Sequence, residues 1–257
     1  WKLPSGRNVP PLLQLPDRMI YLRSFLFECF FFAWTVFLAV LGCSVGLFTR
    51  RIIIWCGRAW GKGTTLLLRL LCGITIEIRG RQHIPEGACI VVSKHQSTLE
   101  TLLFFDLLTR PVYSMKAELA RIPLLGYMIR RSGAIPIKRG GGASSLRDLI
   151  KRAGEALEEG KQLIIFPEGT RAPPRTRGKY NPGAAAIYSR CDVPAIPVAL
   201  NTGSFWGRRT LRKPPGRVII EFLPAIEPGL ERKAFQELLE DVIEEGTEKL
   251  ERESPGH

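Results

Sequence analysis

The chain has 257 residues, a formal net charge of +13 and a hydrophobic share of 45%. That share, together with 24% charged residues, is typical of globular proteins and excludes a disordered chain, and the length is sufficient to bury a large core. Six Cys in a chain of this length are too few for a disulfide scaffold. Because the sequence starts at Trp1 and not at Met, we expect further residues before it in the full protein.

The charge is distributed unevenly along the chain. Residues 227–257 carry ten acidic and four basic side chains, so the remaining residues have a net charge of +19. Such an excess predicts an anionic partner, which is nucleic acid, an anionic membrane surface or a phosphorylated substrate. The sequence has no zinc-finger spacing, no RNP-type aromatic strand and no basic heptad region. We therefore expect no nucleic acid partner, and the other two partners stay open.

Residues 24–48 form an apolar segment of 25 residues in which Glu28 is the one charged residue. About 20 apolar residues cross a bilayer core, so the segment predicts a helix that spans a membrane or is deeply embedded in it. A buried helix of a soluble core is the alternative, and it is disfavoured because a soluble helix of this length rarely lacks a polar face. Basic residues bracket both ends of the segment, so its orientation stays open.

A second apolar stretch runs from Ala59 to Ile74 and is interrupted by basic residues. It is too short and too charged to span a bilayer, and it predicts a helix in the membrane interface that pairs with the first one as a hairpin. The sequence GCSVG at residues 42–46 matches the G-x-S-x-G pattern of a Ser nucleophile, but it lies inside an apolar run instead of at a strand–helix turn. Close helix packing over Gly42 and Gly46 is the favoured interpretation.

From residue 75 onward, short β-branched runs alternate with segments of helical length. The runs predict strands at Thr75–Ile78, Cys89–Val92, Val112–Met115, Ala134–Ile137, Leu163–Phe166, Ile196–Leu200 and Val218–Phe222. The segments between and after them predict helices at Thr98–Leu108, Leu124–Arg131, Ser144–Glu158, Gly183–Ser189 and Phe235–Leu250. This alternation predicts an α/β fold, with a mixed sheet of about seven strands that helices cover on both faces.

His95 directly follows the predicted strand at Cys89–Val92, at the kind of position where open α/β sheets collect catalytic groups. Residues 97–100 (Ser-Thr-Leu-Glu) match the S-x-x-E capping box, which puts Ser97 at the N-cap and Glu100 in the first helical turn. Two interpretations follow from this spacing alone. Either Glu100 only caps the helix, or its carboxylate orients and charges the imidazole of His95, as general-base catalysis requires.

Two further segments place charged groups after predicted strands. Residues 166–171 (Phe-Pro-Glu-Gly-Thr-Arg) end a buried strand, and within them Gly169 permits an unusual backbone angle while Arg171 offers a bidentate fork for phosphate. The alternative is that Glu168 and Arg171 pair with each other inside the turn. Residues 133–139 put two bases at another strand end, for which a solvated pair of charges is the alternative.

In this combination, the sequence resembles the lysophosphatidate (1-acyl-sn-glycerol-3-phosphate) acyltransferase family. The His-x4-Asp motif of that family is matched by His95 and Glu100, in which the acid is one methylene longer. The three other motifs of the family are matched in order at residues 116–139, 166–171 and 193–198. The resemblance extends over about residues 75–222, and an N-terminal membrane-associated helical segment is also similar to the family.

The resemblance implies acyl transfer from a thioester donor to the sn-2 hydroxyl of lysophosphatidic acid, which gives phosphatidic acid in phospholipid biosynthesis. His95 is then the general base, and Glu100 orients it. The acceptor phosphate and its loop are implied to involve Arg139, Glu168, Gly169, Thr170 and Arg171, with Ser97 and Lys116 in supporting roles. The donor is acyl-CoA or acyl carrier protein, and neither a metal nor another cofactor is implied.

The resemblance also implies a location. We expect a membrane-associated helical segment at residues 1–74 and an acyltransferase domain at residues 75–257, which faces the cytoplasm, contacts an anionic membrane surface and belongs to a bacterial inner membrane. Another acceptor, such as glycerol 3-phosphate, a lyso-ornithine lipid or a different lysophospholipid, is an alternative within acyl transfer. A non-catalytic protein that binds anionic membranes and a hydrolase with a Ser nucleophile are alternatives outside it.

Overall fold

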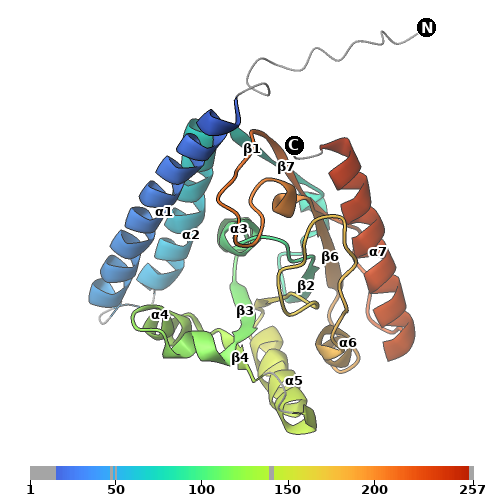
Figure 1. Cartoon of the computed structure of the whole chain (residues 1–257). Helices are drawn as coiled ribbons and strands as arrows, with labels where there is room; N and C mark the ends of the chain where they lie inside the picture. The colour runs from blue at the N-terminus through green and yellow to red at the C-terminus, as the bar shows by residue number, and fades with distance from the viewer. Residues whose placement is uncertain (1–15, 47–48, 50, 139–141, 255–257) are drawn as a thin grey trace, which may run out of the picture.

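The computed structural model describes residues 16–46, 49, 51–138 and 142–254. Within these ranges, a seven-stranded sheet lies between helical layers (Figure 1). The strands are β1 (Ile74–Arg79), β2 (Cys89–Ser93), β3 (Pro111–Lys116), β4 (Ile135–Ile137), β5 (Gln162–Ile165), β6 (Ala195–Leu200) and β7 (Gly216–Phe222). The helices are α1 (Asp17–Val45), α2 (Arg51–Leu67), α3 (Leu99–Leu107), α4 (Leu125–Ser132), α5 (Gly142–Glu158), α6 (Gly183–Tyr188) and α7 (Arg232–Glu253).

The strands follow the order β1-β7-β6-β2-β5-β3-β4 across the sheet. Only the pair β6–β7 is antiparallel among the described strand pairs, so the sheet is mixed. Val91 in β2 lies opposite Ile164 in β5 and Ile196 in β6. Because β2 and β5 are parallel neighbours, the segments that follow them emerge side by side at one edge. The predicted α/β class with a mixed sheet is confirmed.

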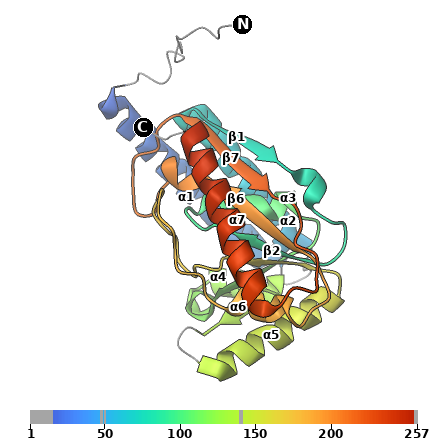
Figure 2. The same ribbon diagram turned by 90° about the vertical axis from the view of Figure 1, so that its right-hand side faces the viewer.

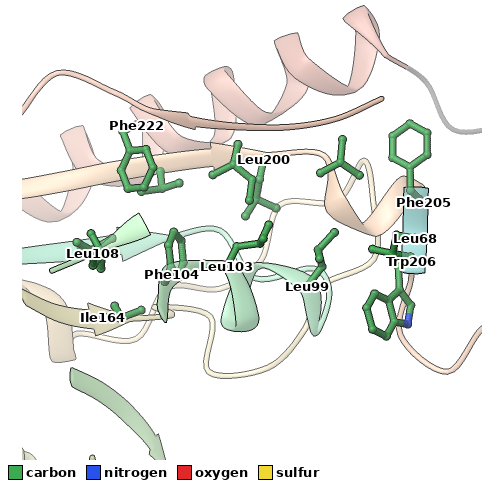
Figure 3. Close-up of a cluster of buried hydrophobic side chains, with 14 of the residues drawn as sticks. Leu68, Leu99, Leu103, Phe104, Leu108, Ile164, Leu200, Phe205, Trp206 and Phe222 are labelled. Atoms are coloured by element: carbon green, nitrogen blue, oxygen red, sulfur yellow. The ribbon is translucent and has the colours of Figure 1, made fainter. Parts of the chain in front are cut away.

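Alternate residues of the central strands face opposite helical layers, as the period of a strand requires. Cys89 and Val91 join a cluster with α3, whereas Ile90 and Val92 join a cluster with α5, α6 and α7. Figure 3 shows part of the first cluster, including Phe104 of α3. Figure 2 shows α7 lying across the other face of the sheet, in front of β6. Burial on both faces explains why the central strands are nearly continuous apolar runs.

Cys89 illustrates how inert the buried thiols of this core are. Its side chain is fully buried in β2, and burial raises the pKa of its thiol to about 12. The thiolate is the reactive form of Cys, so alkylation of the folded protein by iodoacetamide at about pH 8 should leave Cys89 unmodified. Peptide mass spectrometry checks this, and the same reaction in denaturant provides the control. Modification of Cys89 at equal rates in folded and denatured protein would contradict the expected burial.

The first two helices lie side by side, and α2 also packs against α3 (Figure 1). The Nε1 of Trp60 in α2 donates to the hydroxyl of Thr35 in α1 at 2.9 Å. Gly42 permits close packing here, since a Cβ at that position would lie 3.1 Å from the Cε of Met128 in α4. By length and composition, α1 is apolar and long enough to cross a membrane, and most of its surface is not covered by the rest of the protein.

An ion pair joins α1 to the sheet domain. Lys213 is 1% exposed, and its ammonium lies 2.5 Å from the carboxylate of Glu28 in α1. The same ammonium lies over the rings of Phe27 and Trp206, at 5.2 and 5.4 Å from their centroids. The backbone N–H of Lys213 donates to the hydroxyl of Ser24 at 2.9 Å. Glu28, the one charged residue of the apolar segment, therefore joins α1 to the sheet domain through Lys213.

The second helix differs from its prediction. It begins at Arg51 instead of Ala59, and after Leu67 it continues as a π-helical turn (Leu68–Cys72), so Ile74 already belongs to β1. Arg58, which interrupts the apolar pattern, lies within the helix, as suits a good helix former, and its guanidinium donates to the backbone carbonyls of Phe105 and Thr109. The predicted division between residues 1–74 and 75–257 stays a prediction.

Candidate active site

His95 lies in the loop between β2 and α3, and its ring is held on two sides. Its Nδ1 is 2.9 Å from the Oε1 of Glu100, whose side chain is fully buried, while the imidazole keeps 17% of its surface exposed. The ring stacks on Phe166 from the end of β5, with centroids 4.1 Å apart. The structure therefore brings His95, Glu100 and the segment 166–171 together, as the parallel arrangement of β2 and β5 dictates.

The carboxylate of Glu100 contacts both the loop before α3 and the imidazole of His95. Its Oε1 accepts hydrogen bonds from the backbone N–H groups of Gln96 and Ser97, at 2.8 and 2.7 Å, in addition to His95. Its Oε2 accepts the hydroxyl of Thr202 at 2.9 Å. Four donors therefore converge on one buried carboxylate. Glu100 thus tightens the loop before the helix and also holds the imidazole.

The capping box is shifted from its predicted register. The helix begins at Leu99 with Thr98 at its N-cap, and the Ser97 hydroxyl accepts from the N–H of Leu99 at 3.2 Å instead of reaching the N–H of Glu100. The reciprocal half of the box is present, because Glu100 reaches back to the N–H of Ser97. Ser97 is buried, and its supporting role stays a prediction.

The Nδ1–Glu100 contact fixes the tautomer of the imidazole. A carboxylate at Nδ1 requires a proton on that nitrogen, so a neutral His95 carries its lone pair on Nε2. His95 lines a cavity of about 730 Å³, so its imidazole borders a space that a substrate can occupy. The arrangement can remove a proton from a hydroxyl group that is held in the cavity next to Nε2.

The segment 166–171 forms a tight turn after β5. Gly169 has φ of +65°, a left-handed conformation that favours glycine, and its N–H donates to the carbonyl of Phe166 at 3.0 Å. Thr170 is exposed and borders the cavity with Gly169. Arg171 is half-buried, and its Nη1 donates to the hydroxyl of Thr98 at 2.9 Å, so it reaches toward the N-terminus of α3.

Glu168 is directed into the protein. Its Oε2 accepts the backbone N–H of His95 at 2.8 Å, and its Oε1 lies 2.8 Å from the ammonium of Lys94. Its side chain is 2% exposed. Burial raises the pKa of the Glu168 carboxyl, and the hydrogen bond from Lys94 opposes that rise. The pairing of Glu168 with Arg171, which was one alternative, is replaced by a pairing with Lys94.

The cavity is bordered by the strand ends, by α3, α5 and α6, and by the 3₁₀ turn Ala117–Arg121. Lys116 and Lys138 bring positive charge to its edge, and both are exposed. The remaining lining is largely apolar and includes Tyr113, Met115, Leu119, Ile137, Leu146, Leu149, Ile165 and Ala184. Arg139 lies outside the described residues. Among the residues that the structure describes, no group of three or more His, Cys, Asp or Glu side chains is arranged to hold a metal ion.

Four residues at the site escaped the sequence analysis. Lys94 and Gln96 flank His95 and are buried, Thr202 holds Glu100, and Arg208 donates to the hydroxyl of Thr170 at 3.2 Å. A signal for Lys94 and Gln96 was available in the sequence. In an extended segment, adjacent side chains point to opposite sides, so both neighbours of His95 are expected to point away from the cavity. Thr202 and Arg208 follow β6, and only the order of the strands brings them close to the site.

The sequence was compared with protein families and with characterised proteins. Residues 75–201 match the family model described as Acyltransferase. A 1-acyl-sn-glycerol-3-phosphate acyltransferase of Pseudomonas aeruginosa is 35% identical over 170 residues, which are 65% of this chain and 65% of that protein. The alpha form of this enzyme from Homo sapiens is 27% identical over 207 residues, covering 79% of this chain and 72% of that protein.

A solved structure has the same fold. The 1-acyl-sn-glycerophosphate acyltransferase PlsC of Thermotoga maritima aligns with a TM-score of 0.72 over 92% of this chain and 99% of that chain, at 24% identity. The chain spans less than two thirds of the length of the first relatives it matches, including 65% of the Pseudomonas protein and 36% of a chloroplastic one from Brassica napus. With its matching motifs in place on this sheet, the chain belongs to the Acyltransferase family.

Proposed function

We propose that the protein transfers a fatty acyl group from a thioester to the sn-2 hydroxyl of lysophosphatidic acid, giving phosphatidic acid. The observation that carries the proposal is the His95–Glu100 pair, at 2.9 Å, on the border of a largely apolar cavity. The similarity to enzymes named for this acceptor supports it. An apolar cavity suits the acyl chains of both substrates, and basic side chains at its edge suit a phosphate.

The proposed step needs no covalent enzyme intermediate. The Nε2 of His95 takes the proton of the acceptor hydroxyl while its oxygen attacks the thioester carbonyl carbon. The tetrahedral intermediate then expels the thiolate as the C–S bond breaks, and His95 returns the proton to the thiolate. Glu100 holds the Nδ1 proton and stabilises the imidazolium that forms between these two events. Because the acceptor hydroxyl is itself the nucleophile, this scheme requires no Ser or Cys nucleophile.

We assign the acceptor phosphate to the turn after β5. Arg171 supplies a permanent charge and a planar fork, Gly169 and Thr170 border the cavity, and Lys116 adds charge at its edge. Glu168 shapes this turn from behind, because its carboxylate is buried on Lys94. Arg139 is part of the same proposal from its sequence position alone.

Removal of the Arg171 side chain should weaken acceptor binding. A charge-assisted hydrogen bond contributes about 1.5–3 kcal/mol, so Arg171→Ala should raise the KM for lysophosphatidic acid about 10- to 100-fold and leave kcat nearly unchanged. Steady-state kinetics with a saturating donor measure both constants. Arg190→Ala, at an exposed position after α6, is the matched control. A fall in kcat with an unchanged KM would contradict the phosphate role of Arg171.

We also propose that the protein is bound to a membrane through its first two helices. The outward side of α1 carries a row of exposed apolar side chains, among them Tyr21, Phe25, Phe32 and Phe37. Exposed apolar residues at Leu119, Ile122 and Leu124 continue this surface near the cavity. Such a surface suits insertion into lipid. The sheet domain then faces the cytoplasm, where thioester donors are made, and a bacterial inner membrane fits the Pseudomonas relative.

A donor-by-acceptor matrix tests the proposed function. Purified protein in detergent micelles is given acyl-CoA or acyl carrier protein thioesters together with lysophosphatidic acid, glycerol 3-phosphate, a lyso-ornithine lipid or another lysophospholipid. Mass spectrometry then identifies the acylated products. We expect phosphatidic acid as the main product and a preference for one donor. If only another acceptor is acylated, that acceptor is the substrate. If no acceptor leads to consumption of the thioester, acyl transfer is contradicted.

A further inference from the structure

The two residues that flank His95 point away from the cavity, into the protein. Lys94 is fully buried and Gln96 is 1% exposed. Both side chains reach the C-terminal helix α7, which lies across the face of the sheet opposite α3 (Figure 2). Because His95 lies between them, their contacts with α7 fix the backbone on both sides of the base.

Two carboxylates of α7 receive these side chains. The ammonium of Lys94 lies 2.6 Å from the Oε1 of Glu244, and the Nε2 of Gln96 donates to the Oε1 of Glu251 at 2.9 Å. Glu244 and Glu251 are seven residues apart, so they share one face of the helix about two turns apart. Both are buried, at 2% and 4% exposure, although most acidic side chains of this helix are at its surface.

The same two carboxylates also hold the loop after β5. Lys94, which Glu244 holds, donates to the carbonyl of Thr176 at 3.0 Å and lies 2.8 Å from Glu168. Glu251 accepts the backbone N–H of Arg175 at 3.0 Å. Each carboxylate therefore connects the loop that carries His95 with the loop that carries residues 168–171.

Gln96 carries the connection on to the acid partner of the base. Its Oε1 accepts the backbone N–H of Gly203 at 3.1 Å, and the preceding residue, Thr202, donates to the Oε2 of Glu100 at 2.9 Å. Glu100 in turn holds the Nδ1 of His95. A continuous hydrogen-bonded path thus leads from Glu251 on α7 to the imidazole.

We propose that Glu244 and Glu251 are positioning residues for the acyl-transfer reaction, and that α7 sets the relative position of the His95 loop and the loop at residues 167–180. The proposal rests on the proposed function. Buried ion pairs stabilise a fold no better than apolar residues of similar volume, so stability alone does not account for these charges beside His95. A displacement of about 1 Å at a catalytic group lowers the rate about 100-fold, so residues that fix the position of the His95 loop should affect kcat.

Substitution of Glu244 tests the proposal in the full-length protein. Glu244→Gln retains the size of the side chain and removes its charge. We expect kcat per folded molecule to fall about 10- to 100-fold, with the KM of donor and acceptor each within about twofold. Glu251→Ala should behave similarly, whereas Glu245→Gln, at an exposed position of the same helix, should match the parent. Circular dichroism supplies the folded fraction at the assay temperature.

A second measurement is independent of turnover. The chain has three His residues, so the ring signals of His95 in an NMR spectrum are assigned by comparison with His95→Ala. We expect Glu244→Gln to shift these signals and Glu245→Gln to leave them unchanged. An inactive parent protein would overturn the proposed function but leave this measurement valid. Unchanged His95 signals, or full kcat per folded molecule in both Glu244→Gln and Glu251→Ala, would overturn the positioning role.

Discussion

His95→Ala should lose acyl transfer almost completely while the protein stays folded. General-base catalysis contributes about 10²- to 10⁴-fold, so kcat should fall by this factor. The imidazole is partly exposed and borders the cavity, so the loss of stability should stay below about 1.5 kcal/mol. Product formation measured by mass spectrometry, together with thermal unfolding of the same sample, separates these two effects.

The matched control for this variant is His83→Ala, which removes a His from a turn outside the site. The Nδ1 of His83 is 2.8 Å from the backbone carbonyl of Phe222, and His83 is not among the residues that line the cavity. Its activity should equal that of the parent. If folded His95→Ala retains most of the parental kcat, then His95 is not the base, and the assignment of the catalytic pair is lost.

Lys94→Met should cause the largest loss of stability. The ammonium of Lys94 is fully buried and lies within 2.6 to 3.0 Å of Glu244, Glu168 and the carbonyl of Thr176. The Met side chain fills a similar volume but leaves two buried carboxylates without their cation. Removal of one partner from a buried ion pair costs about 3–5 kcal/mol, which we expect in the free energy of unfolding measured with denaturant.

The pH dependence of this loss has a definite sign. Burial raises the pKa of Glu168, and without Lys94 only the hydrogen bond from the backbone of His95 opposes that rise. A raised carboxyl pKa means that the folded state binds more protons than the unfolded one, so stability falls as pH rises above the ordinary carboxyl range. The destabilisation by Lys94→Met should therefore be smaller at about pH 5 than at about pH 8.

Two further variants complete the test of Lys94. Lys233→Met removes a cation that is 89% exposed on α7 and should cost less than about 1 kcal/mol. The double variant Lys94→Met/Glu244→Gln removes one of the two stranded charges and should recover part of the lost stability. If Lys94→Met is no less stable than Lys233→Met, the buried cluster does not stabilise the fold.

The sequence predicted the sheet well because its strands are short apolar runs between turns. Every predicted strand overlaps an observed one. The predicted and observed strand ends differ little, because Gly, Pro and charged residues bound the apolar runs. The pair His95 and Glu100 was also predictable, since both residues lie in one loop and one helical turn. Local spacing alone was sufficient for these features.

The support behind the site was not predictable by the same means. Lys94 and Glu244 are 150 residues apart in the chain, and only the position of α7 on the sheet brings them together. By composition, the acidic C-terminal helix is expected to be exposed to solvent and to offset part of the positive charge of the remaining chain. Which of its carboxylates turn inward depends on tertiary packing, and the weak apolar periodicity of the helix does not distinguish Glu244 from Glu245.

The contact between Lys213 and Glu28 has a consequence for the membrane association that we propose. A domain that is joined to a membrane helix by a flexible linker rotates freely, so its substrate cavity often faces away from the membrane. Here α1 is joined directly to the sheet domain, through a buried cation and the hydroxyl of Ser24. The cavity therefore keeps one orientation relative to α1. With α1 in a membrane, as we propose, the search for a lipid acceptor is reduced to diffusion in the plane of that membrane.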